Sequence, residues 1–170
     1  MNYLLACLLV LELLVGCRPT LPDTPLPDGT VIESLAVFKK ARQMQVFRNR
    51  QLLKTYTIQL GDAPVGPKQF EGDERTPEGC YIINDRNPAS GYHKNLGISY
   101  PTEAQRAYAK TQGQSAGGDV KIHGLPNATS IPEGLFKLDD WTNGCIAVSN
   151  QEVDELYRCV QPNVPICIFP

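Results

Sequence analysis

The sequence has little of what marks several large classes of protein. Lys and Arg number 16 against 18 Asp and Glu, and they form no basic stripe, so we expect no nucleic-acid partner. After residue 20, no apolar run approaches the roughly 18 residues that mark a candidate transmembrane helix. There are only two histidines, and no two cysteines lie two to four residues apart. We therefore expect no metal site and no other cofactor.

The rest of the composition is ordinary for a protein with a globular core. The chain has 170 residues, of which 42% are hydrophobic and 20% are charged. That length suits one domain, and a second would be cramped. We expect a single domain, acting as a monomer.

The first 17 residues are typical of a bacterial export signal. Residues 4–15 form an apolar run that is too short to span a bilayer, and Gly16 precedes Cys17. This ending resembles a lipobox, which implies cleavage before Cys17 and lipid attachment to its thiol. Because Glu12 interrupts the run and no Lys or Arg precedes it, a plain signal peptide or an uncleaved anchor stays open. A lipid anchor would hold the protein on the periplasmic side of a membrane in the cell envelope.

Residues 18–30 are predicted to be a tether. The segment contains four prolines and almost no apolar periodicity, which is typical of a semi-rigid linker. The alternative is an irregular loop packed on the domain. In either case we expect the catalytic domain to occupy residues 31–170.

Short apolar or alternating stretches predict a chain dominated by strands. They lie at 35–38, 43–46, 52–60, 80–83, 120–123, 146–148 and 165–169. Asn49-Arg50 is placed for a hairpin turn, whereas residues 61–79 and 84–91 are expected to be loops. Capping boxes at Thr102 and Ser149 predict two short helices, the first over 102–112. Because no βαβ alternation is visible, we predict a mainly β fold, an antiparallel sandwich or open barrel with two short helices.

The chemistry is expected at His123 and Cys145. Each lies at the end of a predicted strand, and the two are 22 residues apart in the sequence with a loop containing Pro and Gly between them, so the two strands can be neighbours in one sheet. A free thiol has a pKa near 8.5, and therefore only about 3% of it is thiolate at pH 7. An imidazole beside it activates the sulfur, either by accepting the proton or by standing charged next to it.

The neighbours of this pair suit the same chemistry. The backbone carbonyl of Gly124 is placed to accept the ring N–H of His123, which would fix the tautomer. Three successive N–H groups, those of Asn143, Gly144 and Cys145, are expected at a tight turn. Such a nest can hold a developing oxyanion.

These residues carry a resemblance to a known family. The sequence Ile122-His123-Gly124, followed by residues 140–148 (DWTNGCIAV), resembles the L,D-transpeptidase (YkuD-type) catalytic domain. Gly61, residues 76–79 (TPEG) and residues 96–101 (LGISYP) are similar to the same family. The likeness covers about residues 34–170, and its most specific part is the His-Gly and Gly-Cys pair in that order.

The resemblance implies roles residue by residue. His123 matches the base, Cys145 the nucleophile and Gly124 the ring-orienting carbonyl, while the oxyanion donors fall on Asn143, Gly144 and Cys145. Thr142 and Tyr100 are expected to contact substrate. The chain departs from the family at Asn143, where a second His is common, and at Ala147, where Asn or Arg is common.

The reaction implied by the resemblance is a two-step acyl transfer on peptidoglycan stem peptides. The thiolate attacks an L,D-peptide bond, D-Ala leaves, and a thioester remains until an amine resolves it. The family is also acylated by carbapenem β-lactams. One alternative uses water at the same site, as an L,D-carboxypeptidase or a protein–peptidoglycan hydrolase. Another is a non-catalytic, disulfide-stapled lipoprotein that binds cell wall.

The remaining residues have simpler interpretations. Cys80, Cys145, Cys159 and Cys167 would form two disulfides in the non-catalytic alternative, whereas a free Cys145 favours pairing of Cys159 with Cys167. His93 is expected in an exposed loop or, together with Tyr100, in a lid over the groove. Trp141 is expected in the core.

Overall fold

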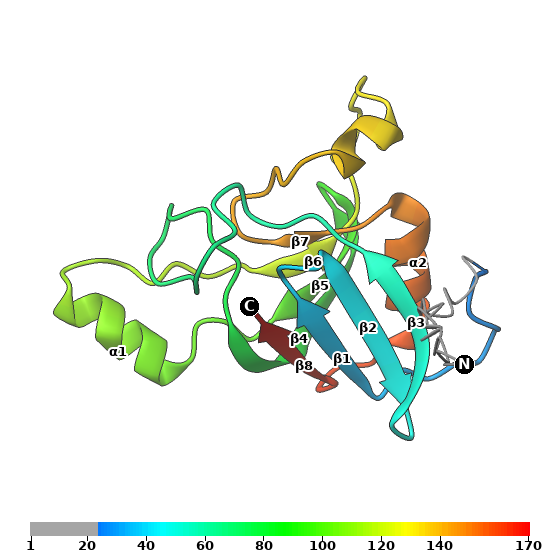
Figure 1. Ribbon diagram of the computed structural model, residues 1–170, viewed down its shortest axis with the longest axis horizontal. Coiled ribbons are helices and arrows are strands. Elements are labelled where there is room, and N and C mark those ends of the chain that lie inside the picture. Colours follow the sequence, from blue (N-terminus) through cyan, green and yellow to red (C-terminus); the bar gives the residue numbers. More distant parts are fainter. Residues whose placement is uncertain (1–23) are drawn as a thin grey trace, which may run out of the picture.

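The computed structural model of the protein describes residues 24–170 (Figure 1). The predicted signal peptide, the lipobox at Cys17 and the first part of the predicted tether lie outside these residues and stay predictions. Within residues 24–170, no helix is both long and apolar enough to cross a membrane.

One eight-stranded sheet forms the body of the protein. In sheet order its strands are β3 (Gln51–Thr57), β2 (Gln43–Arg48), β1 (Ser34–Phe38), β8 (Pro165–Phe169), β4 (Gly79–Ser90), β5 (His93–Ile98), β6 (Lys121–His123) and β7 (Ile146–Ala147). The largest buried side chains, which fill the core inside the sheet, include Tyr56, Ile83, Leu96, Ile122, Ile146, Leu156 and Ile166.

The sheet curls until its two ends meet. Beyond the end of β3, Gln59 exchanges backbone hydrogen bonds with Ala147 of β7, at 3.0 and 2.9 Å. Just after this bridge, the N–H of Thr142 donates to the Leu60 carbonyl at 3.1 Å. The predicted mainly β class is therefore confirmed, and the open barrel describes it better than the sandwich.

The local signals in the sequence place several elements correctly. Asn49 and Arg50 both have positive φ, 51° and 63°, and they join β2 to β3 as predicted. Helix α1 (Glu103–Thr111) begins at Thr102 and helix α2 (Asn150–Cys159) at Ser149, each with both halves of its capping box formed. Helix α2 packs against β5 and β6. The chain between β6 and β7 contains only the short 3-10 helix η1 (Glu133–Lys137).

Three features differ from the prediction. The segment 84–91, expected to be a loop, continues β4 through Ser90, and His93 begins β5 instead of lying in a loop. Two pairings in the sheet are parallel, β1 with β8 and β6 with β7. Neither follows from hairpin signals, because parallel neighbours are joined by long connections that leave no turn signature.

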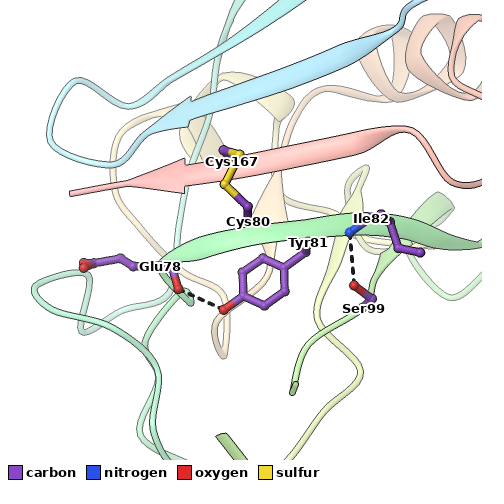
Figure 2. Close-up of a disulfide and its surroundings, with 6 residues drawn as sticks. All are labelled: Glu78, Cys80, Tyr81, Ile82, Ser99 and Cys167. Atoms are coloured by element: carbon purple, nitrogen blue, oxygen red, sulfur yellow. Dashed lines mark hydrogen bonds between the residues drawn. A yellow bond between two sulfur atoms is a disulfide. The ribbon is translucent and has the colours of Figure 1, made fainter. Parts of the chain in front are cut away.

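The predicted disulfide is wrong. Cys80 of β4 is bonded to Cys167 of β8, and these two residues are directly paired across the antiparallel strands (Figure 2). Cys159 is instead a buried free thiol on α2, and Cys145 is also free. The reading with two disulfides is therefore wrong as well. The pairing could not be deduced from spacing, since 87 residues separate Cys80 from Cys167.

Residues 24–30, the end of the predicted tether, lie against the domain. Leu26 is buried, and its N–H donates to Glu155 of α2 at 2.8 Å. The guanidinium of Arg158 donates to the Leu26 carbonyl at 3.0 Å. The packed-loop alternative thus describes this part of the segment.

Candidate active site

A groove of about 320 Å³ opens at the place where the ends of the sheet meet. Its walls bring together the two residues on which the predicted chemistry depends, together with the turn between them. They include Tyr92, His123, Trp141, Asn143, Gly144 and Cys145. A larger hollow of about 530 Å³ lies beside α2, but its lining contains neither His nor Cys.

The register of two short strands puts the thiol and the imidazole on one face. Ile122 of β6 is paired in parallel with Ile146 of β7, and both are fully buried in the core. Because side chains alternate along a strand, His123 and Cys145, which flank these two residues, point to the opposite face. That face is the groove.

The thiol of Cys145 is held by the chain before β6. Its Sγ donates to the backbone carbonyl of Asp119 at 3.7 Å. Within residues 24–170 no hydrogen bond joins this sulfur to the ring of His123. Burial raises the pKa of the thiol above its ordinary value, although the backbone N–H of Lys121 favours the thiolate. The resting sulfur is therefore protonated at neutral pH.

The imidazole of His123 is buried and fixed in orientation. Its Nδ1 lies 2.7 Å from the Gly124 carbonyl, so Nδ1–H donates and Nε2 is left as the free acceptor. The ring lies 4.6 Å from that of Tyr92 and 5.6 Å from that of Trp141, measured between centroids. Burial lowers the pKa of His123 below its ordinary 6.5, and the charge of Lys121 acts in the same direction. The ring is therefore a neutral base at neutral pH.

The turn before Cys145 is organised by the hydroxyl of Thr142. This hydroxyl donates to the Cys145 carbonyl at 2.8 Å and accepts the Gly144 N–H at 3.1 Å. Of the three N–H groups predicted to form an oxyanion nest, that of Gly144 is therefore already bound. The other two, on Asn143 and Cys145, have no hydrogen-bond acceptor among the described residues.

Only glycine fits at position 144. Its φ is +119°, and a Cβ there would lie 2.5 Å from the carbonyl oxygen of Arg75. Gly61 is equally confined, because its Cβ would lie 2.9 Å from the Cα of Gly144. Three backbone segments thus meet behind the turn that presents Cys145.

Several residues lie elsewhere than predicted. Tyr100 does not line the groove: its ring is buried, and its hydroxyl donates to the Ala116 carbonyl at 3.0 Å. Trp141, expected in the core, lines the groove and packs against His123. The Nε2 of His93 pairs with the carboxylate of Asp154 at 2.9 Å, on the α2 side of the sheet.

Sequence reasoning missed four neighbours of the sulfur and the ring. The ring of Tyr92 packs at a tilt against that of His123, Asp119 accepts the hydrogen bond of the thiol, and Lys121 and Lys68 act on the thiol electrostatically. Asp119 carries one detectable signal, since it follows Gly117-Gly118 and has a positive φ of 59°. Lys68 lies in a segment rich in Gly and Pro that the sequence marks only as loop.

Comparison with known families agrees with this geometry. The sequence profile described as the L,D-transpeptidase catalytic domain, YkuD, matches residues 33–168, which include the whole groove. The chain belongs to the YkuD family of L,D-transpeptidase catalytic domains. The predicted family is thereby confirmed.

Individual proteins resemble this chain at modest sequence identity. The L,D-transpeptidase-type protein YafK of Escherichia coli K12 is 32% identical over 149 residues, covering 80% of this chain and 53% of YafK. The crystal structure of the helical cell shape determining protein Pgp2 from Campylobacter jejuni has a TM-score of 0.61 at 25% identity, over 82% of this chain and 48% of that one. An Enterococcus faecium L,D-transpeptidase shares the fold at a TM-score of 0.53 and 14% identity, over 82% of this chain and 50% of that one. The YkuD domain thus spans about half the length of YafK.

Proposed function

We propose that this YkuD domain is a cysteine acyltransferase acting on peptidoglycan stem peptides. The observation that carries the proposal is one groove holding a free thiol, a neutral imidazole and a turn with two unbound N–H groups. These are the nucleophile, the base and the electrostatic stabiliser that acyl transfer needs. Cys145 is the nucleophile, His123 the base and Gly124 the residue that orients the ring.

The first step begins from a neutral pair. As Sγ attacks the carbonyl on the L-centre side of an L,D-peptide bond, its proton passes to Nε2 of His123. The carbonyl oxygen becomes an oxyanion, which the N–H groups of Asn143 and Cys145 stabilise. The C–N bond then breaks, and His123 gives the proton to the departing amine of the D-residue. The acyl group is left as a thioester on Cys145.

The second step reverses these roles. An amine from another stem peptide attacks the thioester carbonyl and loses a proton to His123. The C–S bond breaks as the new peptide bond forms, and His123 returns the proton to the departing sulfur, which regenerates the thiol. Water in place of the amine would give an L,D-carboxypeptidase or a protein–peptidoglycan hydrolase.

The test is incubation of the purified protein with muropeptides of defined structure. We expect cross-linked dimers and released D-Ala from the wild type. Cys145→Ala should abolish both, and His123→Ala should lower the rate about 10²–10⁴-fold, as is typical of a missing general base. Trimmed monomers without dimers would assign the hydrolytic function, and full activity in Cys145→Ala would refute the site.

We also propose a place for the enzyme in the cell. Peptidoglycan as substrate puts it in the cell envelope, and the lipobox-like sequence ending at Cys17 supports a lipid anchor on the periplasmic side of a membrane. The mass of the N-terminal peptide from protein made in a bacterium decides this point. An unmodified Cys17 would rule out the anchor.

A further inference from the structure

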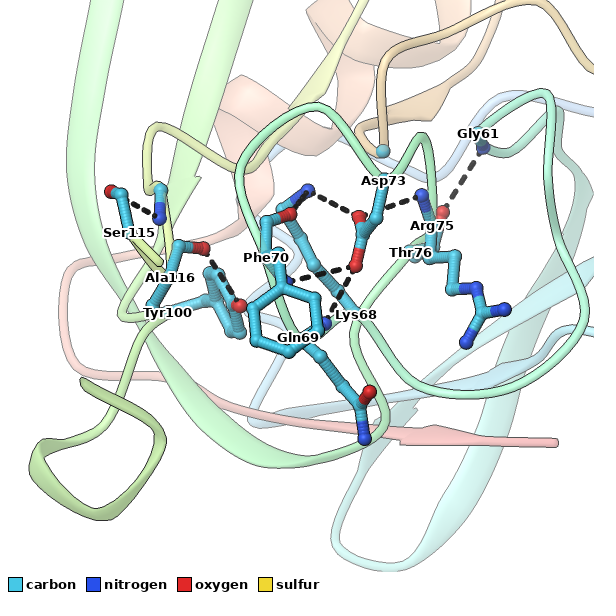
Figure 3. Close-up of polar contacts among 12 residues, drawn as sticks. Gly61, Lys68, Gln69, Phe70, Asp73, Arg75, Thr76, Tyr100, Ser115 and Ala116 are labelled. Carbon is cyan, nitrogen blue, oxygen red and sulfur yellow. Dashed lines mark hydrogen bonds and ion pairs between the residues drawn. The ribbon is translucent and has the colours of Figure 1, made fainter. Parts of the chain in front are cut away.

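The loop between β3 and β4 contains a buried ion pair that the proposed chemistry does not yet use. The side chain of Lys68 is 4% exposed, and its Nζ contacts Oδ1 of Asp73 at 2.8 Å and the Phe70 carbonyl at 3.1 Å. The Asp73 carboxylate also accepts the N–H groups of Gln69, Phe70 and Arg75, at 2.7, 3.0 and 3.1 Å. Figure 3 shows these contacts closing residues 68–75 into a compact loop around the carboxylate.

This loop lies directly behind the turn that presents the nucleophile. The Arg75 carbonyl would be 2.5 Å from a Cβ on Gly144, and Nζ of Lys68 would be only 3.6 Å from it. The ammonium group therefore lies beside Gly144, next to the space that a side chain at this position would occupy. A charge this close to the turn, and shielded from water, interacts more strongly than the same charge on the surface.

We propose that Lys68 is a positioning residue whose buried positive charge stabilises the negative charge that forms at the Cys145 turn during acyl transfer. The proposal rests on Cys145 being the nucleophile. Negative charge appears there twice, on the sulfur as it loses its proton and on the oxyanion that follows. A fixed cation behind the turn favours both without having to reorganise.

The other charges that face the sulfur are less suited to this role. Lys121 is on the same face, but its Nζ pairs at 2.6 Å with the Asp119 carboxylate, which is 83% exposed. Such a pair is screened by water. The charge of Lys121 lowers the pKa of Cys145, but the charge of its partner Asp119 has the larger effect and raises that pKa. The charge of Lys68 lowers that pKa. Asp73 directs its oxygens to its own loop, where four donors share the carboxylate.

Substituting each member of the ion pair in turn distinguishes a structural role of Lys68 from an electrostatic one. Lys68→Met and Asp73→Asn break the same contact, so a purely structural role predicts similar effects from both. An electrostatic role predicts opposite effects, because the first removes a positive charge near the turn and the second a negative one. The measurement is the rate at which iodoacetamide alkylates Cys145 at pH 8, read by peptide mass mapping, since only the thiolate reacts.

We expect Lys68→Met to slow alkylation about 3- to 10-fold, which corresponds to a rise of half to one unit in the pKa of the thiol. Asp73→Asn should accelerate it. Rates in denaturant should be equal for all variants. Shifts in the same direction for Lys68→Met and Asp73→Asn, or no shift in either, would overturn the proposal.

The test also covers two other outcomes. If Lys68→Met fails to fold, Asp73→Asn decides alone, because an unchanged or slower rate contradicts the electrostatic role. Alkylation needs no peptide substrate, so it is independent of the muropeptide assay. Opposite shifts without turnover of muropeptides would retain the role of Lys68 in tuning the sulfur and remove the proposed function.

Discussion

At the scale of single residues, the groove holds a neutral pair at rest. Burial raises the pKa of Cys145 and lowers that of His123, so both groups favour their uncharged forms at neutral pH. The thiol bonds to the Asp119 carbonyl rather than to the ring. Of the two ways in which an imidazole activates a thiol, the structure favours proton transfer during attack over a preformed thiolate–imidazolium pair.

This arrangement predicts a particular pH dependence for alkylation of wild-type Cys145. The rate should rise continuously from pH 6 and have its midpoint at a higher pH than that of an exposed thiol, because burial raises the pKa of Cys145. His123→Ala should leave that midpoint nearly unchanged, since a neutral ring contributes no charge. The measurement is iodoacetamide alkylation from pH 5 to 11, followed by peptide mapping.

A resting ion pair would give a different profile. The thiolate would then be populated at acid pH, and the rate would reach a plateau between about pH 5 and 7. That plateau would disappear in His123→Ala. Observing both results would contradict the neutral pair, although Cys145 could still be the nucleophile.

At the scale of elements, one carboxylate of α2, that of Glu155, contacts both strand β3 and residues 24–30. Glu155, which is 6% exposed, pairs with Nζ of Lys54 at 3.0 Å and accepts hydrogen bonds from Tyr56 and the Leu26 N–H. Burial alone would raise the pKa of Glu155, but these three donors together hold it below its ordinary value of 4.5. The resulting stabilisation is complete above pH 4.5 and is lost as the pH falls through the lowered pKa.

Glu155→Gln should therefore destabilise the domain by about 3 kcal/mol at pH 7, because it leaves the Lys54 ammonium buried without its counter-charge. Urea unfolding followed by circular dichroism measures the change. Asp154→Asn is the matched control one residue earlier on the same helix. Its carboxylate is 45% exposed, and we expect a loss below about 1 kcal/mol. Equal losses in the two variants would contradict the claim that the Glu155 carboxylate stabilises the contact between α2, β3 and residues 24–30.

Signals that depend only on neighbouring residues in the sequence predict several of these elements correctly. The capping boxes at Thr102 and Ser149, the turn at Asn49-Arg50 and the alternation in β2 depend on neighbouring residues, and each is confirmed. The loop holding Lys68 could not be assigned in the same way. Its Gly and Pro residues predict turns, but the contact of Arg75 with Gly144 joins parts of the chain that are distant in sequence.

At the scale of the whole molecule, closure of the sheet assembles the groove. The bridge from Gln59 to Ala147 joins the two ends of the strand order, and the pairing of β6 with β7 brings His123 beside Cys145. The sequence predicted both residues, first from their chemistry and their places at strand ends and then from the family resemblance. The parallel pairings and the disulfide between Cys80 and Cys167 were not predictable, because nonlocal partners leave no mark on local sequence.

The central claim, that Cys145 is an acylated nucleophile served by His123, is tested most directly by intact-protein mass spectrometry after carbapenem exposure. We predict that the wild type gains the mass of one carbapenem, located by peptide mapping at Cys145. His123→Ala should gain it far more slowly, and Cys145→Ala not at all. A wild type that stays unmodified, or a Cys145→Ala variant that is modified equally fast, would contradict the account.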